Sequence, residues 1–102
     1  MSAFLASALL VPNTKTLLWE NTDDEAFTVY IRMANDNAGA IRYWVAIGQG
    51  AYAARKDCIT PNVKVGGYEP WEDTGQRISP GEKVWVMATK DNVSVRVFGV
   101  RD

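Results

Sequence analysis

Carboxylates are the main residues in this chain that could do chemistry, because histidine is absent and cysteine occurs once. Without histidine, the chain lacks the commonest general base and the commonest transition-metal ligand. The single Cys58 cannot form a cysteine-based zinc site or a disulfide within the chain, and no histidine could activate it as a nucleophile. We interpret Cys58 as a small buried apolar residue of a protein made in a reducing cytosol.

The carboxylates gather in two places. Residues 23–25 (Asp-Asp-Glu) lie in a predicted turn and could hold a calcium ion through oxygen ligands, although a solvated turn is the commoner use of such residues. In the second place, Glu69, Glu72 and Asp73 flank Trp71, an arrangement found in glycosidases and sugar-binding proteins. Carboxylates this close together in a loop are common by chance. The sequence therefore predicts a protein that is not an enzyme and that holds no metal ion and no cofactor.

Length and charge limit the partners. The chain has 102 residues, a net charge of −1 and scattered lysines and arginines. A nucleic-acid-binding surface needs clustered basic side chains that release counterions from phosphates, so we expect no nucleic-acid partner. We also expect no membrane partner, because no apolar run approaches the roughly 20 residues that a spanning helix needs. This length fits one domain.

The hydrophobic pattern has a period of two, which predicts strands. Apolar residues alternate with others in residues 27–33, in residues 41–48 and in a terminal hairpin over residues 83–100, and a shorter strand is predicted at residues 16–20. Residues 79–82 (Ser-Pro-Gly-Glu) have the proline and glycine that a type II turn needs. Six or seven such strands without a long helix predict an all-β fold, an antiparallel β-sandwich or jelly-roll-like single domain.

The N-terminal segment MSAFLASALLVP is mildly apolar, but it lacks the basic start of a signal peptide. An arm and a first strand are both compatible with this segment, and we interpret residues 1–12 as a short N-terminal arm and residues 13–102 as the domain. The arm is expected to lie on a neighbouring subunit, where many weak tethered contacts would add up. The side chains expected to make this contact are Phe4, Leu5, Leu9 and Leu10.

Aromatic residues make up 11% of the chain, which is plentiful for so small a core. Several lie on the strand face opposite the main apolar stripe, and aromatic residues and methionine are enriched where one protein buries another. For Trp44, cover by the same chain is an equally good interpretation. The sequence thus predicts a subunit interface at the off-stripe residues Tyr30, Trp44, Trp85 and Met87.

Two long stretches carry a family resemblance. LWENTDDEAFTVYIRMANDNAGAIRYWVAIG, followed at the end by ISPGEKVWVMATKDNVSVRVFGVRD, resembles small structural proteins of tailed bacteriophage virions, and residues 79–102 carry most of the resemblance. It implies a β-sandwich that assembles as a symmetric homo-oligomer, commonly a trimer, and binds the virion without catalysis. The implied partners are copies of the chain itself and the major capsid protein or other virion proteins. The implied location is the virion, after synthesis in the host cytoplasm.

Residues 51–77 depart from that pattern, and we expect the attachment surface there, at Tyr68, Glu69 and Trp71. The leading hypothesis is a capsid decoration or cement protein that bridges shell subunits. The alternative is a tail- or fibre-associated protein or a glycan-binding adhesion module. In that module Trp71 and Tyr68 would stack on sugar rings, and the neighbouring carboxylates would bond to sugar hydroxyls.

Overall fold

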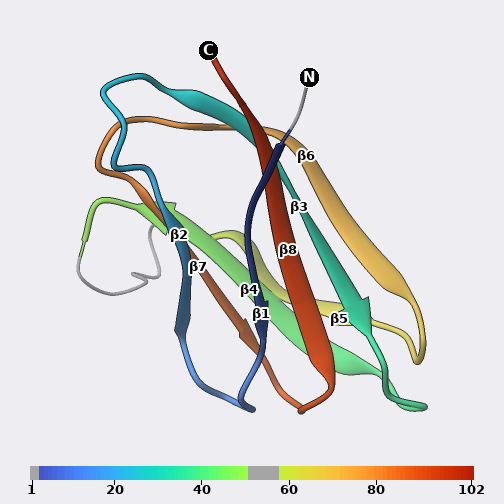
Figure 1. Ribbon diagram of the computed structural model, residues 1–102. Helices are drawn as coiled ribbons and strands as arrows, with labels where there is room; N and C mark the ends of the chain where they lie inside the picture. Colours follow the sequence, from blue (N-terminus) through green and yellow to red (C-terminus); the bar gives the residue numbers. More distant parts are fainter. Residues whose placement is uncertain (1–2, 51–57) are drawn as a thin grey trace.

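The computed structural model describes residues 3–50 and 58–102, apart from the side chains of residues 58–61 and 74. The described chain folds into two four-stranded sheets packed face to face, and no helix long and apolar enough to cross a membrane occurs in it (Figure 1). The strands are β1 (Ala3–Leu9), β2 (Thr16–Glu20), β3 (Phe27–Asn35), β4 (Ile41–Gly48), β5 (Cys58–Val65), β6 (Pro70–Ile78), β7 (Lys83–Ala88) and β8 (Val93–Arg101).

The strand order identifies the topology. Sheet A has the order β1-β8-β3-β6 and sheet B the order β2-β7-β4-β5, with every neighbouring pair antiparallel. The first four strands pair with the last four as β1 with β8, β2 with β7, β3 with β6 and β4 with β5. A long hairpin wrapped in this way into two sheets is a jelly roll. The predicted all-β antiparallel sandwich is therefore confirmed.

The core lies between the sheets and follows the period-two pattern of the strands. In β3 the side chains of Val29, Ile31 and Met33 are buried, while Thr28 and Arg32, at alternating positions, are exposed. Strands β4, β7 and β8 contribute in the same way, because a pleated strand sends successive side chains to opposite faces. These strands contribute to the core cluster the residues Ile41, Tyr43, Val45, Val84, Val86, Ala88, Val93, Val95 and Val97.

The predicted turn at residues 79–82 is also confirmed. The N–H of Glu82 donates to the carbonyl of Ser79 at 3.0 Å, and Gly81 has a φ of +85°. A positive φ at the third position is what a type II turn requires, and glycine adopts it without strain. This turn connects β6 of sheet A to β7 of sheet B.

The predicted N-terminal arm is wrong for the described residues. Ala3–Leu9 is β1, and it forms the edge of sheet A by antiparallel pairing with β8. Leu10 is buried in the core and its N–H donates to the carbonyl of Val93, so β8 continues to hold the segment past the strand. The segment is therefore part of the sandwich of its own chain: its backbone pairs with β8, and Leu5 and Leu10 pack in or against the core.

Candidate functional site

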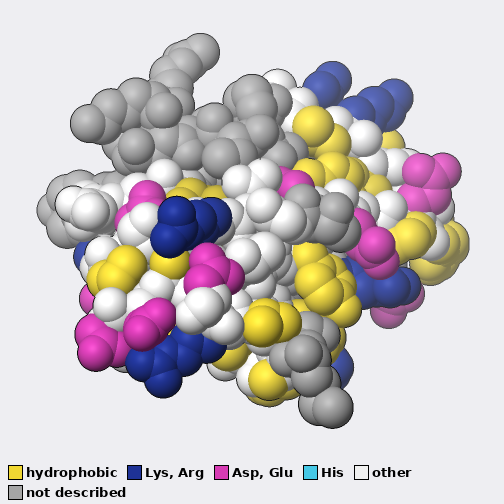
Figure 2. Space-filling model, turned by 90° about the horizontal axis from the view of Figure 1, so that it is seen from above, with side chains coloured by type: hydrophobic (Ala, Val, Ile, Leu, Met, Phe, Trp, Pro, Cys, Tyr) yellow, Lys and Arg dark blue, Asp and Glu magenta, His cyan; other side chains and the backbone are white. Residues whose placement is uncertain are grey.

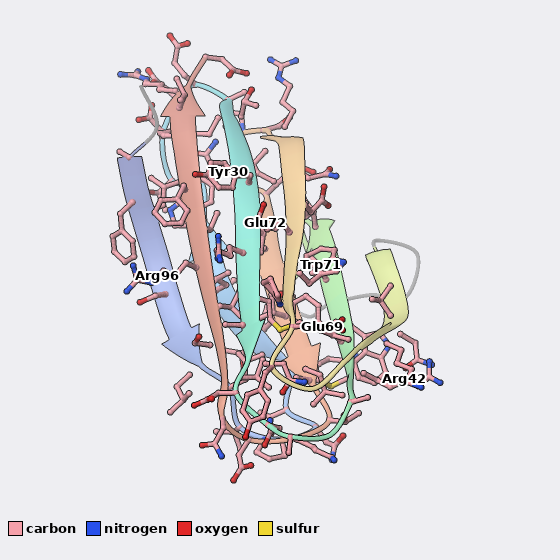
Figure 3. The ribbon with its side chains drawn as sticks, turned by 90° about the vertical axis from the view of Figure 1, so that its right-hand side faces the viewer. Tyr30, Arg42, Glu69, Trp71, Glu72 and Arg96 are labelled. Carbon is pink, nitrogen blue, oxygen red and sulfur yellow. The ribbon has the colours of Figure 1, made fainter. Side chains whose placement is uncertain are left out.

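The outer face of sheet A carries a row of three rings, Phe4, Phe98 and Tyr30, here called the aromatic row. Phe98 stacks on Tyr30 with ring centroids 5.3 Å apart, and Phe4 meets Phe98 edge-on at 6.2 Å. The guanidinium of Arg96 lies 5.8 Å from the centre of the Phe4 ring. Tyr30 and Arg96 lie over the same sheet in Figure 3, well apart from Arg42 of sheet B. Phe4 remains 55% exposed, so the row presents apolar area to solvent.

The outer face of sheet B carries a second apolar surface, here called the sheet B patch: Leu17, Trp44, Trp85 and Met87. Trp85 lies opposite Leu17 on one side of β7, and Met87 lies opposite Trp44 on the other side. Their neighbours along each strand face the core, so these four side chains point outward together. Leu17 is exposed and the other three are partly buried, and the indole N–H of Trp85 has no acceptor among the described residues although solvent does not reach it.

The predicted interface therefore divides between two surfaces. Trp44, Trp85 and Met87 meet on sheet B, whereas Tyr30 lies on the outer face of sheet A, on the other side of the sandwich. Phe98, which joins Tyr30 to Phe4, was missed from sequence. It alternates with Val95 and Val97 in β8, as Trp85 alternates with Val84 and Val86 in β7, so the same off-stripe signal would have found it.

A shallow depression of about 450 Å³ lies beside the aromatic row, where β3 of sheet A ends and β6 begins. A second hollow of about 300 Å³ shares Arg32, Ala34 and Ser94 with it and reaches Phe98. Asp36 and Glu69 line the depression, and neither carboxylate makes an ion pair or a side-chain hydrogen bond within the described residues. The depression thus has polar groups that are free to meet a ligand, with Tyr68 at its rim.

Tyr68 is displayed by an unusual backbone. The N–H of Glu69 donates to the carbonyl of Gly66 at 3.1 Å, which closes a turn with Tyr68 at its third position. Tyr68 has a φ of +58°, in the left-handed region that costs a non-glycine residue about 1–2 kcal/mol. Its N–H donates to the carbonyl of Asn37 at 3.0 Å, and the residue is 69% exposed. The fold therefore holds an aromatic ring in solvent at some cost in backbone strain.

Trp71 does not join Tyr68 and Glu69 at this depression. It lies opposite Met33 on the inner face of sheet A, packs against the core, and meets the ring of Tyr43 edge-on at 5.2 Å. This placement corrects the expectation that Trp71 is a stacking platform beside Tyr68. The reason is the alternation of β6, which sends Trp71 inward and Glu72 outward, where Glu72 pairs with Arg32 at 2.8 Å.

The carboxylate cluster around Trp71 is likewise divided. Asp73 accepts a hydrogen bond from Gln76 at 3.0 Å, and Glu72 is held by Arg32. Near Asp73, the hydroxyl of Tyr43 is buried and has no hydrogen-bond partner within residues 3–50 and 58–102. Burial raises the pKa of Tyr43 far above its usual range, and the charge of Asp73 adds to the effect, so the phenol is neutral at physiological pH.

The acidic turn at residues 23–25 is tied by ion pairs to the end of β8. Arg101 contacts Asp23 at 3.1 Å and Asp24 at 3.0 Å. Asp23 also accepts a hydrogen bond from the backbone N–H of Glu25. Figure 2 shows acidic and basic side chains mixed on the end of the sandwich that it views. No group of three potential metal ligands occurs in the described part of the chain. The predictions for Cys58 and for residues 51–57 lie outside the described side chains.

Comparison of the chain with models of protein families, with curated proteins and with solved structures finds no match in any of the three. The surfaces described above and the resemblance of the sequence to virion structural proteins are therefore the grounds for proposing a function. A jelly roll by itself supports many functions, including those of viral capsid domains and lectins.

Proposed function

We propose that this protein is a non-enzymatic structural component of a bacteriophage virion, a capsid decoration or cement protein that associates with itself and bridges shell subunits. The observation that carries the proposal is the apolar area on both outer faces, the aromatic row on sheet A and the sheet B patch on the other side. A sandwich with an apolar patch on each outer face can contact a copy of itself with one sheet and a shell with the other.

The energetics favour such contacts. Complete burial of a Phe or Trp side chain removes about 150–250 Å² from water and gains roughly 25 cal/mol per Å². The rings of this chain are already partly covered, so each would contribute a fraction of that amount to an interface. Contacts of this strength are weak one at a time. On a shell that presents many identical sites, tethered contacts raise the overall avidity, which suits a protein that decorates a particle.

The test removes each surface in turn. Trp44→Ala combined with Met87→Ala deletes the centre of the sheet B patch, and Tyr30→Ala breaks the aromatic row. We expect the wild-type chain to co-sediment with virions of the phage that encodes it, and at least one of the two variants to bind at least tenfold more weakly, a loss of about 1.4 kcal/mol. Arg42→Ala, an exposed polar position on β4, is the control and should bind as the wild type does. Wild-type binding that neither variant changes would refute the assignment of these faces, and failure to bind virions would refute the proposal.

The depression supports a second candidate, the glycan-binding module. A ring held in solvent at a strained backbone position, with two free carboxylates beside it, is suited to stack on a sugar and to bond to its hydroxyls. This site would use Tyr68, Asp36 and Glu69, without Trp71.

Tyr68→Gly separates binding from folding, because glycine adopts a positive φ freely. We expect the free energy of unfolding to rise by up to about 1 kcal/mol while glycan affinity falls at least tenfold. Urea denaturation measures the first effect and a glycan array followed by calorimetry the second. A wild-type chain that binds no glycan, or a variant that binds as tightly as wild type, would exclude this candidate.

A further inference from the structure

The four edge strands of the sandwich differ in how they are protected. Sheet A ends in β1 and β6, and sheet B ends in β2 and β5. An edge strand presents a row of N–H and C=O groups without strand partners, and proteins commonly block such edges with proline, bulges, charges or short length. Each edge of this fold can therefore be judged by whether it carries one of these devices.

Three of the four edges are blocked. Strand β6 begins at Pro70, and its pairing is interrupted around Gly75, which has a φ of +82°. Strand β5 contains Pro61, which has no N–H to donate, followed by Asn62 with a φ of +55°. Strand β2 has only five residues, and its register shifts between Leu17 and Trp19. Addition of another strand is disfavoured at all three edges.

Strand β1 has an unblocked stretch. Its sequence, AFLASAL, has no charged residue and no proline. It has one irregularity, between Phe4 and Ala6, and Ala6 to Leu9 are then in regular register with β8. Phe4 and Leu9 pair with the outward-facing Phe98 and Ser94, so they also point outward, and they are 55% and 71% exposed. Among the described residues, the edge thus offers backbone groups that have no strand partner, together with exposed apolar side chains.

We propose that β1 pairs with β1 of a second copy, antiparallel about a two-fold axis, and joins two A sheets into one continuous sheet. A strand that pairs antiparallel with its own copy makes each backbone hydrogen bond twice, as a two-fold interface requires. This inference is independent of the proposed virion role, because it depends only on the edge.

The directions of the side chains fix the register. Residues directly opposite each other in an antiparallel pair point to the same face, so outward Ser7 must lie opposite an outward residue. A pairing centred on Ser7 places Ala6 opposite Ala8 and leaves Leu5 unpaired, as it already is against β8. Phe4 of each copy then lies opposite Leu9 of the other. The pairing that gives hydrogen-bond partners to the free backbone groups of β1 therefore also covers its two most exposed apolar side chains.

The first test measures mass. We expect the wild-type chain, 11.3 kDa, to sediment as a dimer or a multiple of one. Ser7→Lys places two like charges face to face on the axis and should raise the dissociation constant at least tenfold. Ser94→Lys, an outward position on the neighbouring β8, is the matched control and should leave the mass unchanged. Unfolding temperatures within a few degrees of wild type would show that both variants fold.

The second test measures the register. In a Cys58→Ala background, Ser7→Cys should form a disulfide between two copies under mild oxidation, because opposed residues of an antiparallel pair have Cα atoms about 4.5–5.5 Å apart. Ser94→Cys should not cross-link. A wild-type chain that is monomeric at every concentration overturns the proposal, as does an oligomer that survives Ser7→Lys or that Ser7→Cys does not cross-link.

Discussion

Replacing Asn35 by alanine is expected to lower the free energy of unfolding by about 3 kcal/mol. The side chain is 2% exposed at the end of β3. Its amide nitrogen donates to the carbonyls of Gly39 at 3.1 Å and Gly66 at 2.9 Å, and its oxygen accepts from the backbone and side-chain nitrogens of Asn37. Alanine would remove all four of these part-buried hydrogen bonds. The carbonyl of Gly66 would keep the N–H of Glu69, and the side-chain nitrogen of Asn37 would keep the carbonyl of Asp91, so the expected loss is that of the bonds to Asn35 itself.

Asn35→Asp is the matched variant, because it keeps the shape and the acceptor but loses the donor. Its carboxylate would face two carbonyl oxygens, which raises the folded-state pKa above the unfolded value of about 3.9. The stabilisation that goes with a raised pKa is present below the unfolded pKa and is lost as the pH rises. Urea denaturation should therefore show a smaller deficit for this variant near pH 4 than near pH 7. A loss below about 1 kcal/mol for Asn35→Ala would contradict the role assigned to its hydrogen bonds.

Gly67→Ala is expected to cost roughly 2 kcal/mol or more in unfolding free energy. A Cβ at this position would overlap the carbonyl oxygen of Ala38 and lie 2.6 Å from its carbonyl carbon. These are backbone atoms of the β3–β4 loop, so relief requires the two loops to move apart. Their separation would also weaken the hydrogen bond from the N–H of Tyr68 to Asn37, which fixes the rim of the depression.

The adjacent glycine gives the control. A Cβ at Gly66 would meet the carboxylate of Glu69 at 2.8 Å, and that group is the far end of a flexible side chain. Neither glycine has a positive φ, so alanine is compatible with both backbone conformations. Gly66→Ala should change the unfolding free energy by less than about 0.5 kcal/mol. Equal losses for the two variants, measured by urea denaturation, would show that close approach of the loops is not what distinguishes them.

The sequence by itself determined the local structure. Alternation of apolar residues predicted Ile41–Gly48 as a strand, and Thr16–Glu20 was predicted as a shorter strand; both have the bounds that the structure has. The proline and glycine of residues 79–82 predicted the turn that closes there. Trp85 and Met87 were placed opposite the core stripe of β7, and they do lie on the outer face. These features follow from residues that are neighbours along the chain, whose pattern is fixed by the two-residue repeat of a strand.

Only the tertiary structure decided which strands lie together. Alternation indicates that Tyr30 and Trp44 each point away from the core, but it does not show that β3 and β4 belong to opposite sheets. The same limit applies to the N-terminal segment. Its apolar sequence is compatible with an arm and with an edge strand, and only its pairing with β8 shows that it is a strand. Trp71 lies inward because β6 pairs with β3 in a register that its own sequence does not specify. Strand partners are far apart in sequence, so the backbone hydrogen bonds that choose them leave no periodic signal in either strand.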